Sequence, residues 1–326
     1  MTYTQRGRII KMTGGLYTVR LDGGQSDSPL TGQTVECRAR GTFRHEQMTP
    51  LVGDLVAVQY DDTSFTLTDG VATPSADRTG LVIDDILPRK NSLIRPPLAN
   101  LDVMLVVIAA ASPDPDIPTV DKLISILEFN GIEPIIVVGK CELSPKRAGK
   151  IAALYEKVGY RTFVLSCYTG EGVKEFSEFA HTALAGKITA VAGASGAGKS
   201  TLLNTVFEGL DLTTGELSEK IGRGKNTTRH TQLFDLPGTE GGFIADTAGF
   251  SLLDFERFDF FELEDLAHTF REFTPYLGKC RYTDCTHVSD EECAILDAVA
   301  KKEISPIRHA SYKELYATLK DKKKYK

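Results

Sequence analysis

The stretch with the clearest chemical meaning begins at Gly193 and reads Gly-Ala-Ser-Gly-Ala-Gly-Lys-Ser-Thr. It matches the pattern G-x-x-x-x-G-K-[ST] and lies between an apolar run and a helical pattern, the setting in which this pattern binds phosphate. Glycines let backbone N–H groups surround a phosphate, and the N-terminus of the following helix adds a favourable dipole. We therefore predict a nucleoside triphosphate site in which Lys199 contacts the β- and γ-phosphates and Ser200 binds Mg²⁺. The expected contacts are Gly193, Ala194, Ser195, Gly196, Ala197, Gly198, Lys199, Ser200 and Thr201.

A second candidate for phosphate chemistry is the D-x-x-G formed by Asp246 and Gly249, again after an apolar run. We expect the carboxylate of Asp246 to help bind Mg²⁺ and the N–H of Gly249 to donate to the γ-phosphate. Between the two motifs, the polar stretch 222–231 contains Thr227 and Thr228, either of which could supply a hydroxyl ligand of Mg²⁺, and we select Thr228. An ordinary solvated basic loop is the alternative interpretation of that stretch.

Two loops upstream of the phosphate loop have residue types that read a guanine base. Their residues are Gly139, Lys140, Cys141 and Glu142 in the first loop, and Ser166 and Cys167 in the second. They look like degenerate forms of N-K-x-D and S-A-x-T-G-x-G, each after a buried strand pattern, where open α/β sheets bind ligands. Gly139 stands in place of Asn and Glu142 in place of Asp. A glutamate can still accept two N–H bonds from guanine, but its extra methylene must be accommodated, so the first loop predicts a weakened guanine preference.

Three of the six cysteines lie in one short segment together with a histidine. The four residues are Cys280, Cys285, His287 and Cys293. Three thiolates and one imidazole complete a tetrahedral shell, and a closed shell is typical of a structural Zn²⁺ rather than a catalytic one. The alternative is a chance cluster of buried cysteines. The remaining cysteines are scattered, and in a reducing compartment this distribution favours one metal site over disulfides.

The elements that must position these residues change in character along the chain. Up to about residue 80, short alternating segments separated by glycine turns predict a small antiparallel barrel. From residue 101, buried runs at 103–108, 134–138, 162–165 and 189–192 alternate with helical patterns at 120–129, 148–158 and 199–206. This alternation predicts a mostly parallel sheet covered by helices. After about residue 250 helical patterns dominate, with a capping box at Ser289 and Glu292 and a last helix around Tyr312.

The composition sets limits on the class of protein. The 326 residues carry 38 Lys and Arg against 44 Asp and Glu, a net charge of −6, with 41% hydrophobic residues, which is typical of an ordered globular protein. No apolar run approaches the ~18 residues of a membrane-spanning helix. The start has no secretory apolar region, so we expect a cytoplasmic protein. We also expect a monomer without a membrane partner. Candidate phosphate contacts for RNA are the lysine-rich tail and three arginines of the barrel region, Arg38, Arg40 and Arg44. The alternative is an ordinary solvated charged face.

The order of the motifs is first base loop, second base loop, phosphate loop, threonine loop and D-x-x-G, which is a circular permutation of the usual GTPase order. With this order the sequence resembles the ribosome small-subunit-dependent GTPase A family over nearly its whole length, including 52–54, 86–96 and the cysteine segment. The resemblance implies an RNA-binding OB-fold at 1–80, a permuted P-loop GTPase domain at 81–252 and a helical zinc domain at 253–326. It also implies GTP hydrolysis during maturation of the small ribosomal subunit, with binding to its rRNA and release coupled to hydrolysis.

The residue that positions the attacking water departs from known patterns. Phe250 follows the D-x-x-G, where Ras-type enzymes have a water-orienting Gln. The resemblance implies a catalytic His directly before the threonine pair, but this sequence has Asn226 there, so we expect Asn226 or His230 to position the water, with Lys199 stabilising the transferred phosphoryl group. Two alternatives remain. One is a nucleotide-gated RNA-binding scaffold with little turnover, and the other is a P-loop NTPase with relaxed base specificity that uses ATP.

Overall fold

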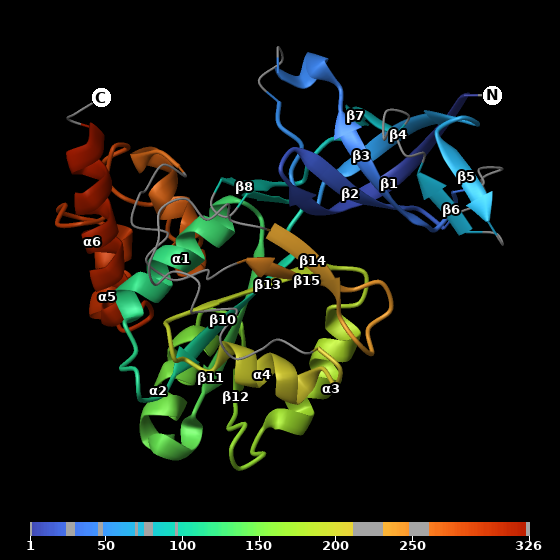
Figure 1. The fold of residues 1–326 in the computed structure, drawn as a ribbon. Coiled ribbons are helices and arrows are strands. Elements are labelled where there is room, and N and C mark those ends of the chain that lie inside the picture. Colours follow the sequence, from blue (N-terminus) through green and yellow to red (C-terminus); the bar gives the residue numbers. More distant parts are fainter. Residues whose placement is uncertain are drawn as a thin grey trace, which may run out of the picture. The chain divides into compact units, whose positions relative to one another are not determined.

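The computed structural model describes residues 2–23, 30–44, 48–68, 71–74, 81–94, 97–210, 231–247 and 261–323 (Figure 1). The chain divides into two compact units, each assembled from several stretches. The first unit contains Met1–Asp102, Leu184–Ala190 and Gly215–Ala248, and the second contains Val103–Ala183, Val191–Thr214 and Gly249–Lys326. Among the helices of the described ranges, none combines the length and the apolar character that crossing a bilayer requires.

A five-stranded barrel forms the core of the first unit. Its strands are β1 (Thr2–Thr13), β2 (Leu16–Leu21), β3 (Thr34–Ala39), β4 (Leu55–Asp61) and β7 (Val82–Ile86). β1 pairs with both β2 and β4, β3 runs parallel to β7, and β7 pairs with β4, so the circuit closes in the order β1-β2-β3-β7-β4. Every second side chain points inward, as in β2, where Val19 and Leu21 are buried. The predicted N-terminal barrel is confirmed, and its closed five-stranded order is that of an OB-type barrel.

The other elements of the first unit are short. They are η1 (Gly41–Arg44), the hairpins β5 (Phe65–Thr68) with β6 (Val71–Pro74) and β8 (Ser92–Ile94) with β9 (Pro97–Ala99), and the antiparallel pair β14 (Thr231–Asp235) and β15 (Phe243–Thr247). β14 joins the barrel strand β1 through the pair Lys11 and Gln232. β13 (Ile188–Gly193) runs parallel to β15. The first unit therefore extends beyond the barrel into strands that belong to the GTPase region of the sequence.

A buried ion pair joins Asp54 to Arg89, which belong to two of the stretches that carry the resemblance. The carboxylate of Asp54, which is fully buried, accepts from Nε and Nη2 of Arg89, each at 2.7 Å. The preceding Gly53 has a φ of 94°, and a Cβ there would lie 2.1 Å from the carbonyl oxygen of Ala99. Only glycine allows the backbone to approach Ala99 this closely. The glycine and the ion pair together pack the segment around Asp54 against the strands that follow.

The second unit contains three parallel strands, in the order β12 (Arg161–Val164), β11 (Glu133–Gly139) and β10 (Val103–Ala109). Both β10 and β11 are buried almost throughout, as expected for a parallel sheet covered on both faces. The helices of this part are α1 (Ile117–Phe129), α2 (Pro145–Glu156), α3 (Val173–Ala183) and α4 (Lys199–Val206), with the short η2 (Cys141–Leu143). The alternation of strands and helices predicted from the sequence is confirmed, and α3 adds a helix that the sequence patterns above did not include.

The C-terminal part of the second unit is helical. It consists of η4 (Leu263–Thr269), η5 (Arg271–Phe273), α5 (Ala294–Ala300) and α6 (Pro306–Lys323). α5 begins at Ala294 with Cys293 as its N-cap, so the helix start predicted from a capping box at Ser289 and Glu292 is wrong. The physical reason is that Glu292 has a φ of 52° and accepts the N–H of Arg281, which fixes it in the loop of the cysteine segment.

One buried cation joins this helical part to α1. Arg308 on α6, 1% exposed, donates to Glu272 of η5 at 2.8 and 3.1 Å and also donates to Asp121 of α1. Tyr155 of α2 donates to the same Asp121 oxygen at 3.0 Å, and the guanidinium of Arg308 lies 4.8 Å from the ring of Phe270. A buried charge is tolerated only with such partners, so α1, α2, η5 and α6 meet at one point.

Candidate functional site

The phosphate loop connects β13 to α4 and is shaped by close backbone packing. Gly193 ends the buried strand, and a Cβ there would lie 2.4 Å from the carbonyl oxygen of Val107 on β10. Gly198, with a φ of 99°, is the N-cap of α4. Only glycine allows the backbone at position 193 to approach Val107 this closely without a shift. The start of the loop therefore lies against β10.

Lys199 holds its ammonium group inside this loop. Its Nζ donates to the carbonyl oxygens of Gly193 at 2.9 Å and Ala194 at 3.0 Å, and the residue is 7% exposed. Burial lowers the pKa of Lys199. A phosphate bound in the loop would supply the counter-charge that favours the protonated amine, so this position suits a cation that contacts phosphate oxygens.

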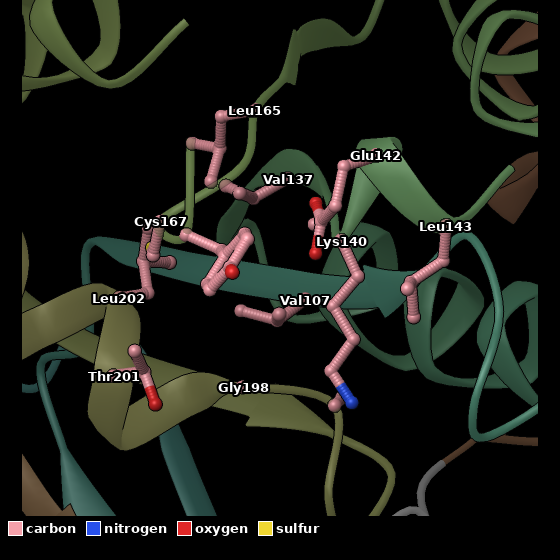
Figure 2. Close-up of a pocket in the computed structure, with 13 residues that line it drawn as sticks. Val107, Val137, Lys140, Glu142, Leu143, Leu165, Cys167, Gly198, Thr201 and Leu202 are labelled. Carbon is pink, nitrogen blue, oxygen red and sulfur yellow. The ribbon is translucent and has the colours of Figure 1, made fainter. Parts of the chain in front are cut away.

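The two base loops and the phosphate loop meet around one cavity of about 230 Å³ (Figure 2). Its lining residues are Val107, Val137, Gly139, Lys140, Glu142, Leu143, Leu165, Cys167, Tyr168, Ala197, Gly198, Thr201 and Leu202. Figure 2 shows Lys140 and Glu142 on one side of the cavity and Cys167, Thr201 and Leu202 on the other. The walls are mainly apolar, and a few polar groups converge on them, which is the usual composition of a ligand pocket.

Glu142 carries the most informative polar group in this cavity. Its Oε2 is buried and has no hydrogen-bond partner among the described residues. A buried carboxylate oxygen needs a donor, and the N–H groups of a guanine base are donors of the right kind. The extra methylene relative to aspartate is thus accommodated with the carboxylate at the cavity wall.

Lys140 ties the first base loop to the phosphate loop. Its backbone is left-handed, with a φ of 55°, and its Nζ donates to the carbonyl oxygens of Ser112 and of Gly196, the latter at 2.7 Å. At the neighbouring Gly139 a Cβ would lie 3.8 Å from the carbonyl oxygen of Ala197, an ordinary contact. The loop therefore keeps its link to the phosphate loop through Lys140, although Gly139 lacks the amide of the usual asparagine.

The second base loop is held by a buried serine. Ser166 is fully buried, and its Oγ accepts the backbone N–H groups of Tyr168 at 3.2 Å and Thr169 at 3.1 Å. The turn ends at Gly172, where a Cβ would lie 2.2 Å from the carbonyl oxygen of Val164. Ser166 and Gly172 therefore hold the backbone of this loop, and the hydroxyl of Ser166 is already engaged within it.

The cysteines of the two base loops have different surroundings. Cys167 is half-buried and lines the cavity, and burial raises the pKa of its thiol. Cys141 is buried, with its Sγ 3.7 Å from Oε2 of Glu171, and burial also raises the pKa of Cys141. Both thiols are therefore protonated at neutral pH, as expected for cysteines that pack as small apolar residues.

The residues expected to contact Mg²⁺ and the attacking water are described only in part. The backbone of Asp246 lies near the end of β15, paired with Gln232 of β14. Four other predicted site residues lie outside the described residues: Asn226, Thr228, His230 and Gly249.

The predicted metal ligands converge in the second unit. The ligand atoms of Cys280, Cys285, His287 and Cys293 all lie within 4.8 Å of one another. Nδ1 of His287 is 3.6 Å from Sγ of Cys280 and 3.5 Å from Sγ of Cys293, and the two sulfurs are 3.8 Å apart. A tetrahedral Zn²⁺ would place two sulfurs about 3.8 Å apart and a sulfur and a nitrogen about 3.5 Å apart. The cluster can hold a metal ion, and its dimensions fit a tetrahedral one.

Contacts around the cluster orient its histidine. Burial lowers the pKa of His287, which favours the neutral imidazole that a metal requires. The backbone carbonyl of His287 lies 2.8 Å from Nε2 of His309, and the hydroxyl of Tyr312 donates to the carbonyl oxygen of Thr286 at 2.9 Å. His309 and Tyr312 of α6 therefore contact the segment that carries the predicted metal ligands. Arg308 of the same helix contacts α1.

Sequence reasoning named the two base loops but not the whole pocket. The apolar wall comes from Val107, Val137, Leu165 and Leu202, and the rim includes Leu143 and Tyr168. The available signal was that Val107 and Val137 lie near the carboxyl ends of buried strands, that Leu165 directly follows one, and that the others lie beside the motifs.

Comparisons with known proteins agree with this geometry. A family model described as RsgA GTPase matches residues 86–256, and one described as RsgA N-terminal domain matches residues 6–66. A relative from Agathobacter rectalis, named small ribosomal subunit biogenesis GTPase RsgA, is 37% identical over 322 residues, covering 98% of this chain and 99% of the relative. A relative of the same name from Bacillus pumilus is 38% identical over 322 residues, covering 97% of this chain and 98% of the relative.

The chain belongs to the RsgA GTPase family.

Solved structures of similar proteins share the fold over their full length. The crystal structure of YjeQ from Thermotoga maritima has a TM-score of 0.75 and 29% sequence identity, covering 97% of this chain and 99% of that one. The structure of YloQ, described as a circularly permuted GTPase, has a TM-score of 0.72 and 28% identity, covering 98% and 96%. The RsgA fold therefore accounts for the unusual motif order, in which both base loops precede the phosphate loop.

Proposed function

We propose that this protein is a GTPase that acts as a maturation factor of the small ribosomal subunit, binds its rRNA and is released upon GTP hydrolysis. One observation carries the nucleotide part of this proposal. The phosphate loop and both base loops line one cavity, and in it a buried oxygen of Glu142 lacks a donor among the described residues. The role on the ribosome rests on family membership and on the names of the relatives.

In this proposal the chain's own residues orient the triphosphate for attack by water. Lys199 contacts the β- and γ-phosphates, while Ser200, Thr228 and Asp246 bind the Mg²⁺ that neutralises phosphate charge. Asn226 or His230 positions the water. An Asn226→Ala, His230→Ala double variant is expected to lose subunit-stimulated phosphate release while still binding GDP. Unchanged stimulated turnover would remove both residues from this role.

The Cys3His cluster is proposed to hold one structural Zn²⁺, because all four positions of a tetrahedral shell are filled by the protein. We assign 1–80 to an RNA-binding barrel domain, 81–252 to the permuted GTPase domain and 253–326 to the zinc domain. The protein acts as a cytoplasmic monomer without a membrane partner.

Side-chain pairing within the first unit refines the choice of RNA contacts. Arg40 is exposed and lines a hollow between the β1–β2 turn and η1, but its guanidinium is already paired, since its Nη2 donates to Gln59 Oε1 at 2.8 Å and its Nη1 pairs with Asp84. Arg38 is exposed and lines the same hollow. The side chain of Arg44 lies outside the described residues. Arg38 is therefore the preferred phosphate contact of the three.

The deciding experiment measures phosphate release from GTP and from ATP, each with and without purified small ribosomal subunits, at one salt concentration. GTP-selective release that rises with subunits is the expected result. Nonselective release would favour an NTPase with relaxed base specificity, which Gly139 and Glu142 suggest. Negligible release with both nucleotides would favour a nucleotide-gated RNA-binding scaffold, which Phe250 and Asn226 suggest.

A further inference from the structure

Tyr168 combines two properties that rarely occur together. It lines the apolar cavity between the base loops and the phosphate loop, and yet 90% of the residue is exposed to solvent. A tyrosine ring usually buries a large apolar area in a folded protein. Leu143, 54% exposed, also lines the cavity, so large apolar side chains from both base loops stand at its rim.

The exposure of Tyr168 does not result from a loosely held loop. Its backbone N–H donates to Oγ of the fully buried Ser166, and the N–H of Gly170 donates to the carbonyl oxygen of Ser166 at 2.9 Å. The N–H of Ser166 donates in turn to the carbonyl oxygen of Glu171 at 2.9 Å. The turn thus fixes the backbone of Tyr168 at the cavity and leaves its ring without a packing surface.

The chemistry of the cavity indicates what would cover the ring. Glu142 presents a carboxylate oxygen that suits the N–H edge of guanine, and Val137 and Leu165 supply apolar walls for its faces. A base whose edge contacts Glu142 still has part of its surface toward solvent. An aromatic side chain can cover that surface, because aromatic rings stack on any base. Tyr168 is the aromatic residue in the cavity lining.

We propose that Tyr168 is a base-contacting residue, whose ring packs on the purine of the bound nucleotide and closes the cavity against solvent. This inference rests on the proposed function, because it needs a purine nucleotide in the cavity. The ring adds affinity without selecting guanine over adenine, since stacking depends on the π-face that both bases have. Selection stays with Glu142.

The sequence contains no tryptophan, which makes a direct test possible. Tyr168→Trp introduces a single tryptophan at the cavity, which can be excited selectively in the presence of the remaining tyrosines, and we expect GDP to change its emission on binding. The matched control is Tyr282→Trp, because Tyr282 is 48% exposed and belongs to the cysteine segment. GDP is expected to leave the emission of that variant unchanged.

Affinity gives an independent readout. Calorimetric titration with GDP is expected to show about tenfold weaker binding for Tyr168→Ala and nearly wild-type binding for Tyr168→Phe, which keeps the ring. Tyr282→Ala serves as the control. Thermal unfolding should be unchanged in all of them, since the ring of Tyr168 is exposed.

The outcomes separate this inference from the proposed function. Wild-type protein that binds neither GDP nor a GTP analogue would overturn both. Wild-type binding combined with unchanged affinity of Tyr168→Ala and unchanged emission of Tyr168→Trp would overturn the role of Tyr168 alone. If Tyr168→Ala keeps its GDP affinity but loses stimulation by small subunits, the ring is a docking contact and the inference is wrong.

Discussion

Glu142 places a carboxylate in the cavity lining, although its side chain is one methylene longer than the aspartate of the usual N-K-x-D pattern. Its carboxylate lines the cavity, and one oxygen is buried without a donor among the described residues. The neighbouring Gly139 leaves ordinary contact space toward the phosphate loop, and Lys140 makes the bridge to Gly196. The loop therefore brings a carboxylate and a lysine to the cavity, and it lacks the amide of an asparagine.

The first prediction concerns Glu142→Gln. The amide replaces one carboxylate oxygen by a donor, so a guanine base loses an acceptor and meets an N–H group instead. We expect GDP affinity to fall at least about tenfold, since hydrogen bonds to charged groups contribute about 1.5–3 kcal/mol. Weak ADP binding should be unaffected. Equilibrium titration with both nucleotides checks this, with Glu171→Gln as the control, because Glu171 contacts Cys141. An equal loss for GDP and ADP would contradict a base-reading role.

The second prediction uses the thiol of Cys167 as a reporter of the cavity. Cys167 is half-buried in the cavity wall, whereas Cys37 is 1% exposed and burial raises the pKa of its thiol to about 12. N-ethylmaleimide is expected to label Cys167 slowly, faster as the pH rises because the thiolate is the nucleophile, and GDP should protect it. Cys37 should stay unlabelled with or without GDP. Peptide mass spectrometry gives both rates, and equal labelling of Cys167 with and without GDP would place the nucleotide elsewhere.

At the scale of elements, the strands and helices that were predicted correctly are those marked by a pattern of neighbouring residues in the sequence. The buried runs at 103–108 and 134–138 correspond to β10 and β11, since a continuous apolar run has a direct meaning in a parallel sheet. The prediction for α4 is correct to the residue, because the phosphate loop ends where the helix must begin. α2 and α6 begin earlier than the apolar pattern suggested, at Pro145 and Pro306, where proline suits a first helical turn.

Contacts between distant residues could not be predicted. The helix does not begin at the capping box predicted at Ser289, because this residue lies in the loop between Cys280 and Cys293. The shape of that loop depends on contacts between residues on both sides of Ser289, such as the hydrogen bond from Arg281 to Glu292. The pairing of Arg308 with Asp121 joins positions 187 residues apart, and neither position has a local pattern that marks it. The phosphate loop and the two base loops were visible in the sequence as motifs, whereas the apolar wall of the cavity that they line depends on how the strands pair.

The third prediction concerns this buried cation. Arg308→Met leaves two carboxylates, Asp121 and Glu272, without their cation, and removing one partner of a buried pair destabilises by about 3–5 kcal/mol. Chemical unfolding should show this loss at pH 7.5. Burial already raises the pKa of Asp121, against the charge of Arg308. Without that charge the folded-state pKa lies further above the unfolded value. The folded variant then binds more protons than the unfolded chain, and its deficit shrinks as the pH falls toward 5.

The control is Arg271→Met. Arg271 pairs with Glu128 and Glu133, but its side chain is 31% exposed, so we expect a smaller loss of about 1 kcal/mol. Equal losses for the two variants would mean that burial does not decide the contribution of these arginines.

At the scale of the whole molecule, a net charge of −6 would by itself repel RNA. Pairing within the fold resolves this, because several cations are already matched by acids. Arg20, for example, donates to both carboxylate oxygens of Asp235 at 2.5 and 2.9 Å. Binding to a polyanion then depends on where the exposed cations without an acidic partner lie, and the net charge is a poor guide to it.

The fourth prediction follows from that local view. Arg38→Ala is expected to weaken binding to small ribosomal subunits severalfold and to reduce the slope of log affinity against log salt, since one phosphate contact is lost. Arg20→Ala, which removes a cation already paired with Asp235, should change neither. Sedimentation binding over a salt series measures both quantities. An Arg38→Ala variant with wild-type slope would exclude Arg38 from the RNA interface.

The link between Arg308 and Asp121 has a consequence for the order of synthesis. Translation produces Asp121 long before α6, so the nascent chain carries a carboxylate whose buried position has no cation yet. Burying that carboxylate alone is unfavourable, and α1 cannot complete its packing until the last helix emerges. A chain that stops before α6 is therefore incompletely folded and more accessible to proteases, and the second unit can complete its packing only after α6 has been synthesised.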